Sequence, residues 1–567
     1  MAMAGGAVRA RWALRDRLPD EAEAALAEYP PIQRRILYGR GVGDAATAAR
    51  FLRRESEARD DPFLLSGMQA AADRLGRAAR AGERVVVYGD YDADGVCATA
   101  LLCAALEAGG ARAQPYIPDR FSQGYGVHAE ALQQLHDDGA RLVVTVDCGV
   151  RSVEEAERAR RLGLDLIITD HHEPGAELPS ALAVIDPRQP GDAYPFKGLA
   201  GVGLAYKLAQ ALAQRLGGPA PNGALDLVAV GTVADVAPLI SENRRLVHEG
   251  LRRLRGEAGG ARAGLQALVH AAGYQARVDA SAIGFGLGPR LNAAGRMGRA
   301  DDAYRLLTAH APDEAQRLAG ALNSANQRRQ DETARAVELA RAQVLEQGLP
   351  ALIALLDERF HRGVLGLAAG RLAEEFYRPA LLAAPAGALV HGSARSIGEF
   401  PITQALDACA GLLMRHGGHR TAAGFTLRRE NWQALCARLG EQAESSLGGK
   451  ELRPVLRPDA EVGFDEIDWD LVRFLDALEP CGEGNPPALL LARAVEVLEA
   501  RAVGADRSHL KLRLRRDGRA MNAIAFRRGA LADQLPARVD LVFRPVRNEF
   551  REQVSLELQV VDLRAPG

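Results

Sequence analysis

The sequence carries little net charge. Its 567 residues include 71 Lys and Arg against 73 Asp and Glu, which gives a formal net charge of −2 at pH 7. A protein that binds nucleic acid or an anionic membrane through its overall charge has a clear basic excess. The near balance excludes that mode of binding, so any basic surface on this chain must be local.

Long apolar runs are also absent. No stretch approaches the roughly 18 consecutive apolar residues that a membrane span requires. Residues 1–11 include Arg9 but lack the continuous apolar core of a secretory signal. We therefore expect a cytoplasmic protein with no membrane partner.

Cysteine is scarce and scattered. Zinc ribbons need paired Cys-x-x-Cys motifs, and disulfide frameworks need a much denser spacing. The sequence has neither pattern, so both classes are excluded and the chain is predicted to be reduced. Its six cysteines are Cys97, Cys103, Cys148, Cys409, Cys436 and Cys481.

The bulk composition is typical of a large globular protein. Hydrophobic residues make up 47% of the chain and charged residues 25%, which excludes a disordered or fibrous protein. The chain is several times the length of an ordinary domain, so we expect several domains with clefts between them.

Residues 81–186 alternate short β-branched runs with helical stretches rich in Ala, Leu and Arg. The alternation predicts βαβ units, and the lack of polar positions within the runs predicts a parallel sheet buried on both faces. In open α/β sheets, ligands gather at the carboxyl ends of the strands, where acidic residues fall here. The predicted strands are 84–88, 142–146, 164–169 and 183–185.

The rest of the chain predicts three further parts. A stretch rich in Ala, Arg, Glu and Gln at 301–347 predicts one long exposed helix. A second, smaller α/β pattern follows it, with Ser393 and Arg395 after its last strand. Five strand-like runs then predict a small barrel of the OB kind, a common platform for single-stranded nucleic acid. In chain order we predict an N-terminal extension (1–60), a catalytic domain (61–300), a connecting helix (301–347), a smaller α/β domain (348–447) and an OB-like domain (448–567).

The strongest local signal is Gly-Asp-Tyr-Asp-Ala-Asp-Gly, directly after the predicted strand 84–88. It places the carboxylates of Asp90, Asp92 and Asp94 at one strand end. Unpaired, these groups repel each other and raise one another's pKa, so a cation is their natural stabiliser. The alternatives are a solvated acidic turn and an EF-hand calcium loop, but the latter needs a terminal Glu that the residues after Cys97 do not supply.

Further ligand-type residues follow the later apolar runs. Asp147 follows the run 142–146, His171 and His172 follow the next run, and Asp235 follows another apolar stretch. Singly, an Asp there is a common helix cap. Together, many oxygen ligands with one imidazole suit Mn²⁺ or Mg²⁺ better than zinc, and the number of carboxylates predicts two ions.

Other residues are candidates for nucleophilic attack or for binding phosphate. Cys148 beside the metal residues could act as a nucleophile, but a Cys at a strand end is far more often a small buried filler. Arginine in turn or glycine-rich contexts suits phosphate, although most Arg residues here are ordinary surface residues. The candidates are Arg120, Tyr125, Arg290 and Arg296.

The ordered set Asp-Tyr-Asp-Ala-Asp at 90–94, Asp147, Asp-His-His at 170–172 and Asp235 resembles the motifs of the DHH phosphoesterases, in wording close to the RecJ exonucleases. The resemblance implies that Asp92 holds one metal ion, that Asp147 bridges two, and that the second ion is held by Asp94, His171 and Asp235. It makes Asp90 a ligand or a nearby acid. His172 would contact the scissile phosphate or support His171.

Two later segments carry the same resemblance. The Ser-x-Arg at 393–395 and the Gly-Gly-His ending at His419 resemble the DHH-associated domain, which implies that Ser393 and Arg395 clamp a 5′-phosphate while His419 contacts the phosphate nearer the metals. Residues 479–486 resemble the segment that opens the RecJ OB domain, although Cys481 stands where an aromatic residue is usual.

The resemblance implies a metal-dependent exodeoxyribonuclease. It would hydrolyse single-stranded DNA from a 5′ end by a two-metal mechanism and release 5′-mononucleotides in repair and recombination, with single-strand-binding protein and a helicase as partners. The alternatives are a DHH phosphodiesterase for cyclic dinucleotides or short oligoribonucleotides, and a non-catalytic single-strand-binding scaffold.

Overall fold

The structure is a computed structural model that describes residues 8–55, 60–274, 278–550 and 553–566. The remaining positions belong to the predicted N-terminal extension, catalytic domain and OB-like domain. The chain divides into two compact units, which are described one by one. One comprises Ala13–Asn292, Ala300–Gly320 and Arg457–Gly567, and the other Met1–Trp12, Ala293–Arg299 and Ala321–Leu456.

The first unit contains the predicted parallel sheet. Its five strands have the order β3-β2-β4-β5-β6, and all neighbours are parallel. The central strands are buried along nearly their whole length, as their unbroken apolar runs predict. The strands are β2 Arg84–Gly89, β3 Arg112–Tyr116, β4 Leu142–Val146, β5 Asp165–Thr169 and β6 Ala183–Ile185.

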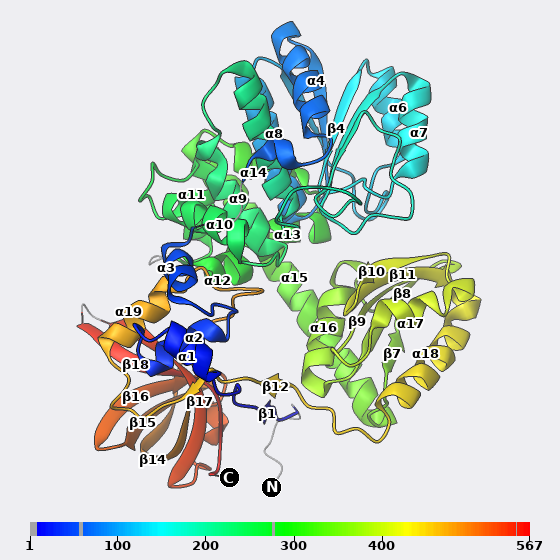
Figure 1. Cartoon of the computed structure of the whole chain (residues 1–567). Coiled ribbons are helices and arrows are strands. Elements are labelled where there is room, and N and C mark those ends of the chain that lie inside the picture. Colours follow the sequence, from blue (N-terminus) through cyan, green and yellow to red (C-terminus); the bar gives the residue numbers. More distant parts are fainter. Residues whose placement is uncertain (1–7, 56–59, 275–277, 551–552, 567) are drawn as a thin grey trace. The chain divides into compact units, whose positions relative to one another are not determined.

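Helices cover both faces of this sheet (Figure 1). One face packs against α6 (Ala129–Asp137) and α7 (Val153–Leu162), which share a core with β2, β4 and β5. The other face packs against α4 (Met68–Ala81), α5 (Ala93–Ala108) and α8 (Gly201–Leu216). The carboxyl ends of the strands are thereby left as the edge at which side chains can meet a ligand.

A helical region follows the sheet. The apolar stretch before Asp235 is the helix α9 (Leu225–Ala234) rather than a strand, so Asp235 lies at a helix C-terminus. The sequence leaves the type of this apolar stretch open, because a helix that is apolar on every side gives no periodic signal. The other elements here are α10 Ser241–Leu254, α11 Ala263–Ala271, α12 Ala280–Ala282, the π-helical turn η3 Ile283–Leu287 and α13 Gly288–Met297.

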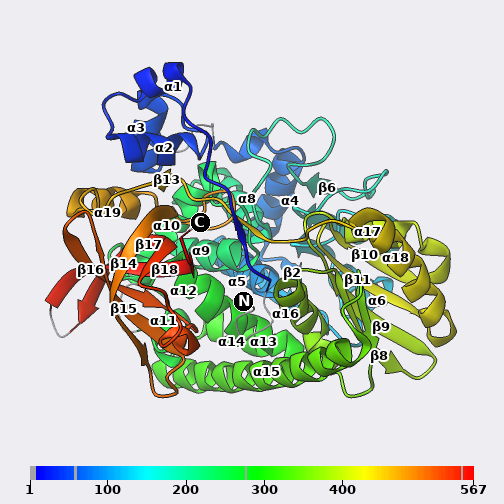
Figure 2. The ribbon, with the colours of Figure 1, turned by 90° about the horizontal axis from the view of Figure 1, so that it is seen from below.

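The predicted connecting helix at 301–347 is two helices. Residues Asp301–Thr308 form α14, whose buried Leu306 and Leu307 pack into the core. The 36-residue α15 begins at Pro312 and runs to Gln347, and Figure 2 shows it in full length. Proline fits the first turn of a helix and cannot continue a preceding one, which explains the break.

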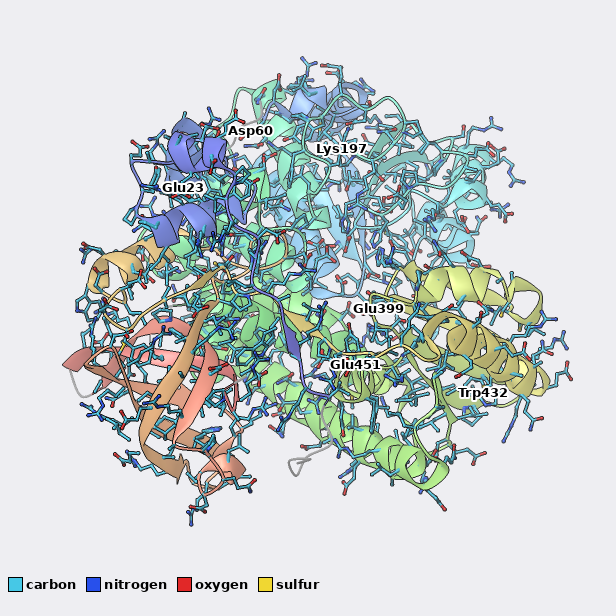
Figure 3. All side chains as sticks on the ribbon, turned by 60° about the horizontal axis from the view of Figure 1, so that its bottom comes forward. Glu23, Asp60, Lys197, Glu399, Trp432 and Glu451 are labelled. Atoms are coloured by element: carbon cyan, nitrogen blue, oxygen red, sulfur yellow. The ribbon has the colours of Figure 1, made fainter. Side chains whose placement is uncertain are left out.

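The second unit contains a five-stranded mixed sheet with the order β10-β11-β9-β8-β7. Ser393 and Arg395 lie within β9 rather than after it, because that strand extends to Arg395. Trp432, labelled in Figure 3 at the start of α18, stacks on Phe425 of β11 with 6.4 Å between ring centroids. The elements are β7 Ile353–Leu356, α16 Leu365–Phe376, β8 Ala380–Ala386, β9 Leu389–Arg395, α17 Ile402–Asp407, β10 Arg415–His419, β11 Ala422–Arg428 and α18 Trp432–Leu447.

The C-terminal strands form a closed barrel. Each strand pairs with the next in the order β14-β15-β16-β18-β17, and β17 pairs back onto β14. The pairing of β16 with β18 is parallel and the others are antiparallel, as in the five-stranded Greek-key barrel of an OB fold. The elements are α19 Trp469–Ala477, β14 Leu490–Val503, β15 His509–Arg516, β16 Arg519–Ala525, β17 Arg538–Phe550 and β18 Gln553–Arg564.

Short elements complete the chain. The N-terminal region forms α1 (Asp20–Ala25), α2 (Pro31–Tyr38) and α3 (Ala45–Arg53), and β1 (Arg11–Trp12) pairs with β12 (Val455–Leu456). Across the residues that the structure describes, no helix is long and apolar enough to cross a membrane.

Candidate metal centre and substrate site

The acidic loop after β2 is built as a helix N-terminus. Strand β2 ends at Gly89, and Asp92 is the N-cap of α5. The Asp92 carboxylate accepts the backbone N–H groups of Asp94 at 2.9 Å and Gly95 at 3.1 Å. A Cβ atom at Gly95 would lie 2.6 Å from the carbonyl oxygen of Asp90. Glycine at this position therefore allows the loop to fold closely enough to gather three carboxyl groups.

Asp94 is fixed by a second helix N-terminus. Its two carboxylate oxygens accept the backbone N–H groups of Gly201, at 2.7 Å, and Val202, at 2.9 Å, in the first turn of α8. A Cβ atom at Gly201 would lie 2.6 Å from Cβ of Asp147, and one at Gly231 would lie 2.7 Å from Oδ1 of Asp94. These two glycines make room for the acidic cluster, and we did not identify them from the sequence.

The residues after β4 and β5 complete the cluster. Asp147 follows β4 in a left-handed conformation, with φ 64°, and its Oδ1 lies 3.1 Å from Nε2 of His171. The same His171 atom lies 3.7 Å from Oδ2 of Asp235, the residue that ends α9. A positive φ is uncommon for a residue other than glycine, and such strained residues concentrate at functional sites.

The side chains form three overlapping groups in which one ligand atom from each residue lies within 4.8 Å of the others. One group combines Asp94 and Asp235 with His171. Another combines Asp90 and Asp92 with Asp147, and Asp147 also belongs to the third group, with His171 and His172. The first two groups share no residue but adjoin through Asp147 and His171, which both belong to the third, and two adjoining ligand sets are the arrangement that a pair of divalent cations requires.

When no cation is bound, burial and mutual repulsion disfavour ionisation of the carboxyl groups. Burial, followed by the charge of Asp92, raises the pKa of Asp94 to about 7. The same two effects raise the pKa of Asp90 well above its ordinary value. Burial and neighbouring carboxylates also raise the pKa of Asp147 and of Asp235. A cation would offset this cost, which is the electrostatic signature of a metal site.

The residues fit hard divalent cations. Oδ1 of Asp90 is buried and has no hydrogen-bond partner among the described residues, so it offers an oxygen to a ligand. The cluster supplies many carboxylate oxygens and few imidazoles, and thiolates do not enter it. Mn²⁺ and Mg²⁺ prefer this donor set, whereas zinc favours nitrogen and sulfur.

Asp170 positions His172 instead of joining the cluster, a role that we did not derive from the sequence. Its Oδ1 lies 2.8 Å from Nδ1 of His172, and its Oδ2 accepts the backbone N–H of Val150 at 2.9 Å. Although burial acts in the opposite direction, this contact raises the pKa of His172 to about 9. The hydroxyl of Tyr125 lies 3.0 Å from the same Nδ1 and also contacts the carbonyl oxygen of Asp147.

Two of the predicted phosphate-binding arginines, Arg120 and Arg290, belong to segments that contact the acidic loop. Arg120 lies over the ring of Tyr91, within the acidic loop, at 4.8 Å from the ring centroid. Arg290 lies on α13, where its Nη1 donates to the carbonyl oxygen of Gly286 at 2.9 Å. The same helix carries Asn292, whose side chain accepts the backbone N–H of Ala93 at 2.8 Å and joins α13 to the metal loop.

The other predicted phosphate ligands belong to the second unit. Nη1 of Arg395 donates to Oγ of Ser393 at 3.1 Å, so these two side chains form one polar group on β9. His419 is exposed at the end of β10, which pairs with β11. Nη1 of Arg296 donates to the carbonyl oxygen of Gly363 at 3.2 Å. The structure thus assembles Ser393 and Arg395, and places His419 in the hairpin of the same sheet.

Cys148 is buried at 1% exposure, as expected of a small filler residue. Burial, followed by the charge of Asp170, raises the pKa of its thiol well above the ordinary value. A thiol of this kind is a poor nucleophile because little thiolate forms near neutral pH.

Comparison with known families matches three parts of the chain. The N-terminal domain of the DHH family matches residues 84–232, the DHHA1 domain residues 348–445 and the RecJ OB domain residues 458–562. These matches follow the order of the parallel sheet, the mixed sheet and the barrel. The fold and the acidic site define a phosphoesterase of the DHH class.

Curated relatives extend over nearly the whole chain. The single-stranded-DNA-specific exonuclease RecJ of Bacillus subtilis is 36% identical, over 98% of this chain and 71% of the relative. The RecJ exonuclease of Escherichia coli is 37% identical, over 96% of this chain and 98% of the relative. The crystal structure of RecJ in complex with Mn²⁺ from Thermus thermophilus matches with a TM-score of 0.84 at 35% identity and covers 99% of this chain and 80% of that one. The chain belongs to the RecJ family.

Proposed function

We propose that this protein is a single-stranded-DNA-specific exonuclease that degrades DNA from the 5′ end and releases 5′-mononucleotides. The observation that carries the proposal is the pair of adjoining ligand groups, centred on Asp147 and His171, at the carboxyl edge of the parallel sheet. Relatives named single-stranded-DNA-specific exonuclease support it over a phosphodiesterase for cyclic dinucleotides or short oligoribonucleotides and over a non-catalytic scaffold.

In this proposal Asp90 and Asp92 hold one divalent cation, Asp94, His171 and Asp235 hold the other, and Asp147 contributes to both. When bound, such a pair acidifies water and neutralises charge on a phosphodiester, which is the chemistry of two-metal phosphodiesterases. The relatives crystallised with Mn²⁺ and with Mg²⁺ support either ion.

The protein's own side chains orient the substrate and supply protons. With Nδ1 of His172 facing Asp170, Nε2 is the ring atom that can donate to an oxygen of the scissile phosphate. The positive charge of His172, maintained by Asp170, and that of Arg120 favour the additional negative charge of the transition state. Tyr125 restrains the His172 ring, so this donor is pre-oriented.

In this proposal the direction of degradation is set by which end of the DNA the protein holds. We propose that Ser393 and Arg395 bind the terminal 5′-phosphate through their joined polar group, that His419 contacts the next phosphate, and that Arg290 and Arg296 hold the backbone. A guanidinium can grip a phosphate with two parallel hydrogen bonds. We also propose that the protein works in the cytoplasm with single-strand-binding protein and a helicase, which would supply single strands.

The test uses the full chain with Mn²⁺ on single-stranded DNA labelled at its 3′ end. We expect rapid release of mononucleotides from a 5′-phosphorylated strand, no effect of a 3′ block, and strong inhibition by a 5′ block. Arg395→Ala should lose the preference for a 5′-phosphate, whereas Arg429→Ala, an exposed arginine of the same domain, should keep it. Intact single-stranded DNA together with cleavage of a cyclic dinucleotide would overturn the proposal.

A further inference from the structure

Phe285 is exposed to an unusual degree. Its side chain is 83% exposed, more than any other large apolar side chain in the described part of the chain. A phenylalanine in that position forgoes the hydrophobic gain of burial, and its ring is open to a ligand. It lies on the π-helical turn η3, and such turns occur frequently at functional sites.

The turn that carries Phe285 packs beside the metal centre. A Cβ atom at Gly288 would lie 2.9 Å from Cβ of Ala234, and one at Gly284 would lie 3.7 Å from Cγ1 of Val233. Val233 and Ala234 form the last turn of α9, immediately before the metal residue Asp235. The glycines of η3 and α13 therefore allow the backbone that carries Phe285 to approach this end of α9 closely.

Helix α13, which follows η3 directly, contacts the acidic loop after β2. Asn292 accepts the backbone N–H of Ala93, between Asp92 and Asp94. It lies seven residues after Phe285, about 10 Å along a helix that rises roughly 1.5 Å per residue. Phe285 is therefore within reach of the nucleotides next to a phosphodiester bound at the metals.

The residues around Phe285 favour the binding of a nucleotide. Arg290 folds back onto the same turn and donates to the carbonyl oxygen of Gly286 at 2.9 Å, which places a positive charge on the turn that carries Phe285. The ring of Tyr274 packs over Gly286, where a Cβ atom would lie 2.3 Å from it, and thereby supports the turn. One turn thus combines an exposed aromatic ring, on which a base of single-stranded DNA can stack, with a guanidinium that can bind the backbone.

We propose that Phe285 is a substrate-positioning residue on which a base of the single-stranded DNA stacks while the strand occupies the metal centre. This inference rests on the proposed exonuclease function and adds the base-binding element that the metal residues and phosphate ligands lack. Stacking on an aromatic ring is tolerant of base identity, because every base has a π face. It would therefore hold the strand in place without making cleavage sequence-specific.

The experiment measures nucleotide release by the full chain with Mn²⁺ on 5′-phosphorylated single strands that each carry one abasic site at a different position. In the wild type, we expect release to slow when the abasic site reaches the position of Phe285, because no base is there to stack. Phe285→Ala should raise KM by about tenfold or more with a smaller change in kcat, and should remove the position-dependent slowing.

Two further variants separate stacking from bulk. Phe285→Trp keeps an aromatic face and should keep the abasic response, whereas Phe285→Leu keeps apolar volume and should lose it. Leu345→Ala is the control, because Leu345 is also highly exposed, at 69%, but lies on α15. It should leave KM and the abasic response unchanged.

The outcomes distinguish this inference from the function on which it rests. If the wild type degrades single-stranded DNA and Phe285→Ala keeps the wild-type KM and abasic response, Phe285 does not stack a base. A lower melting temperature with an unchanged abasic response would likewise overturn the inference, because it would show that Phe285 serves only packing. Wild-type protein that leaves single-stranded DNA intact would contradict the proposed function itself.

Discussion

At the residue scale, the acidic cluster makes the metal-free protein sensitive to pH. Asp94 has its pKa raised to about 7 in the fold by burial and the charge of Asp92, whereas an unfolded Asp titrates near about 4. The folded state therefore binds a proton more tightly, and the free energy of unfolding falls as the pH rises from about 4 to about 7.

We predict that protein stripped with a chelator melts at a lower temperature at pH 8 than at pH 5.5, and that Mn²⁺ removes this difference by stabilising the ionised carboxylates at pH 8. Differential scanning fluorimetry across this pH range measures the melting temperatures with and without Mn²⁺. Asp94→Asn, which cannot ionise, should weaken the pH dependence of the metal-free protein. A melting temperature of the stripped wild type that rises with pH would contradict this electrostatic account.

Asp170 supports a second prediction at this scale. Asp170→Asn keeps an acceptor for the N–H of Val150 but removes the charge that holds His172 protonated. Partners outside the ligand shell typically contribute about 10- to 100-fold, so we expect kcat to fall by that order. Because the pKa of His172 falls toward its ordinary value, the basic limb of the pH–rate profile should move to lower pH. A uniform loss without such a shift would leave Asp170 only a structural role.

The sequence could predict that these acidic and imidazole side chains lie together, because each follows an apolar run. It could not predict the role of Asp170, because that role depends on the orientation of a side chain two residues away. Nor could it predict that Phe285 is exposed, since a phenylalanine among small apolar residues is typical of a buried position.

At the element scale, the N-terminus of α8 holds the acidic cluster in place. Gly201 donates its N–H to Asp94 and lies against Asp147, so its lack of a side chain lets two carboxyl groups of the acidic cluster lie close together. Gly203 lies on the same helix, but a Cβ atom there would meet only the flexible side chain of Leu199, at 3.3 Å.

We predict that Gly201→Ala reduces nuclease activity by more than about tenfold, because its methyl group displaces Asp147, and that it also weakens Mn²⁺ binding. Gly203→Ala should retain activity, since alanine favours a helix over glycine by up to about 1 kcal/mol. Activity and Mn²⁺ titrations of both variants provide the measurement. Equal activities would show that the approach of α8 does not determine the geometry of the site.

The elements themselves were predicted to different degrees. Strand β2 and helix α5 have distinct apolar runs separated by the acidic loop, and their existence was predictable. The contact of Asp94 with Gly201 joins residues 107 positions apart, and no local pattern encodes it. The break before Pro312 was missed because the composition on both sides is that of one continuous helix, although the proline itself was a signal.

At the scale of the whole molecule, Arg244 of α10 connects three parts of the first unit. It is buried, its guanidinium lies 3.9 Å from the ring centroid of Phe51 in α3, and its Nη2 donates to the carbonyl oxygens of Ala477 and Leu478 at 3.1 and 2.9 Å. A cation at the C-terminus of α19 also interacts favourably with the helix dipole. The barrel domain is thereby attached to the region that follows Asp235.

We predict that Arg244→Ala lowers the free energy of unfolding by about 2–4 kcal/mol, because it removes the buried guanidinium from the ring of Phe51 and takes away the donor to the carbonyl oxygen of Ala477. Arg252→Ala on the same helix is the matched control. It removes a partly exposed pair with Glu249 and should change stability by about 0.5 kcal/mol or less. Urea denaturation of both variants measures the difference, and equal values would refute the connecting role of Arg244.

The order of domains was largely predictable, since each has its own periodicity: buried strands, a mixed pattern, then short strands that close a barrel. The contacts that join the domains were not predictable, because a single buried arginine such as Arg244 cannot be distinguished in the sequence from the many exposed arginines.

The central claim is that two divalent cations share one acidic cluster. Equilibrium dialysis against Mn²⁺, with the bound metal counted per chain, tests it most directly. We predict two bound ions for the wild type, one ion for Asp92→Asn and for Asp235→Asn, and a severe loss of both for Asp147→Asn. A single ion in the wild type, or two ions retained by Asp147→Asn, would contradict it.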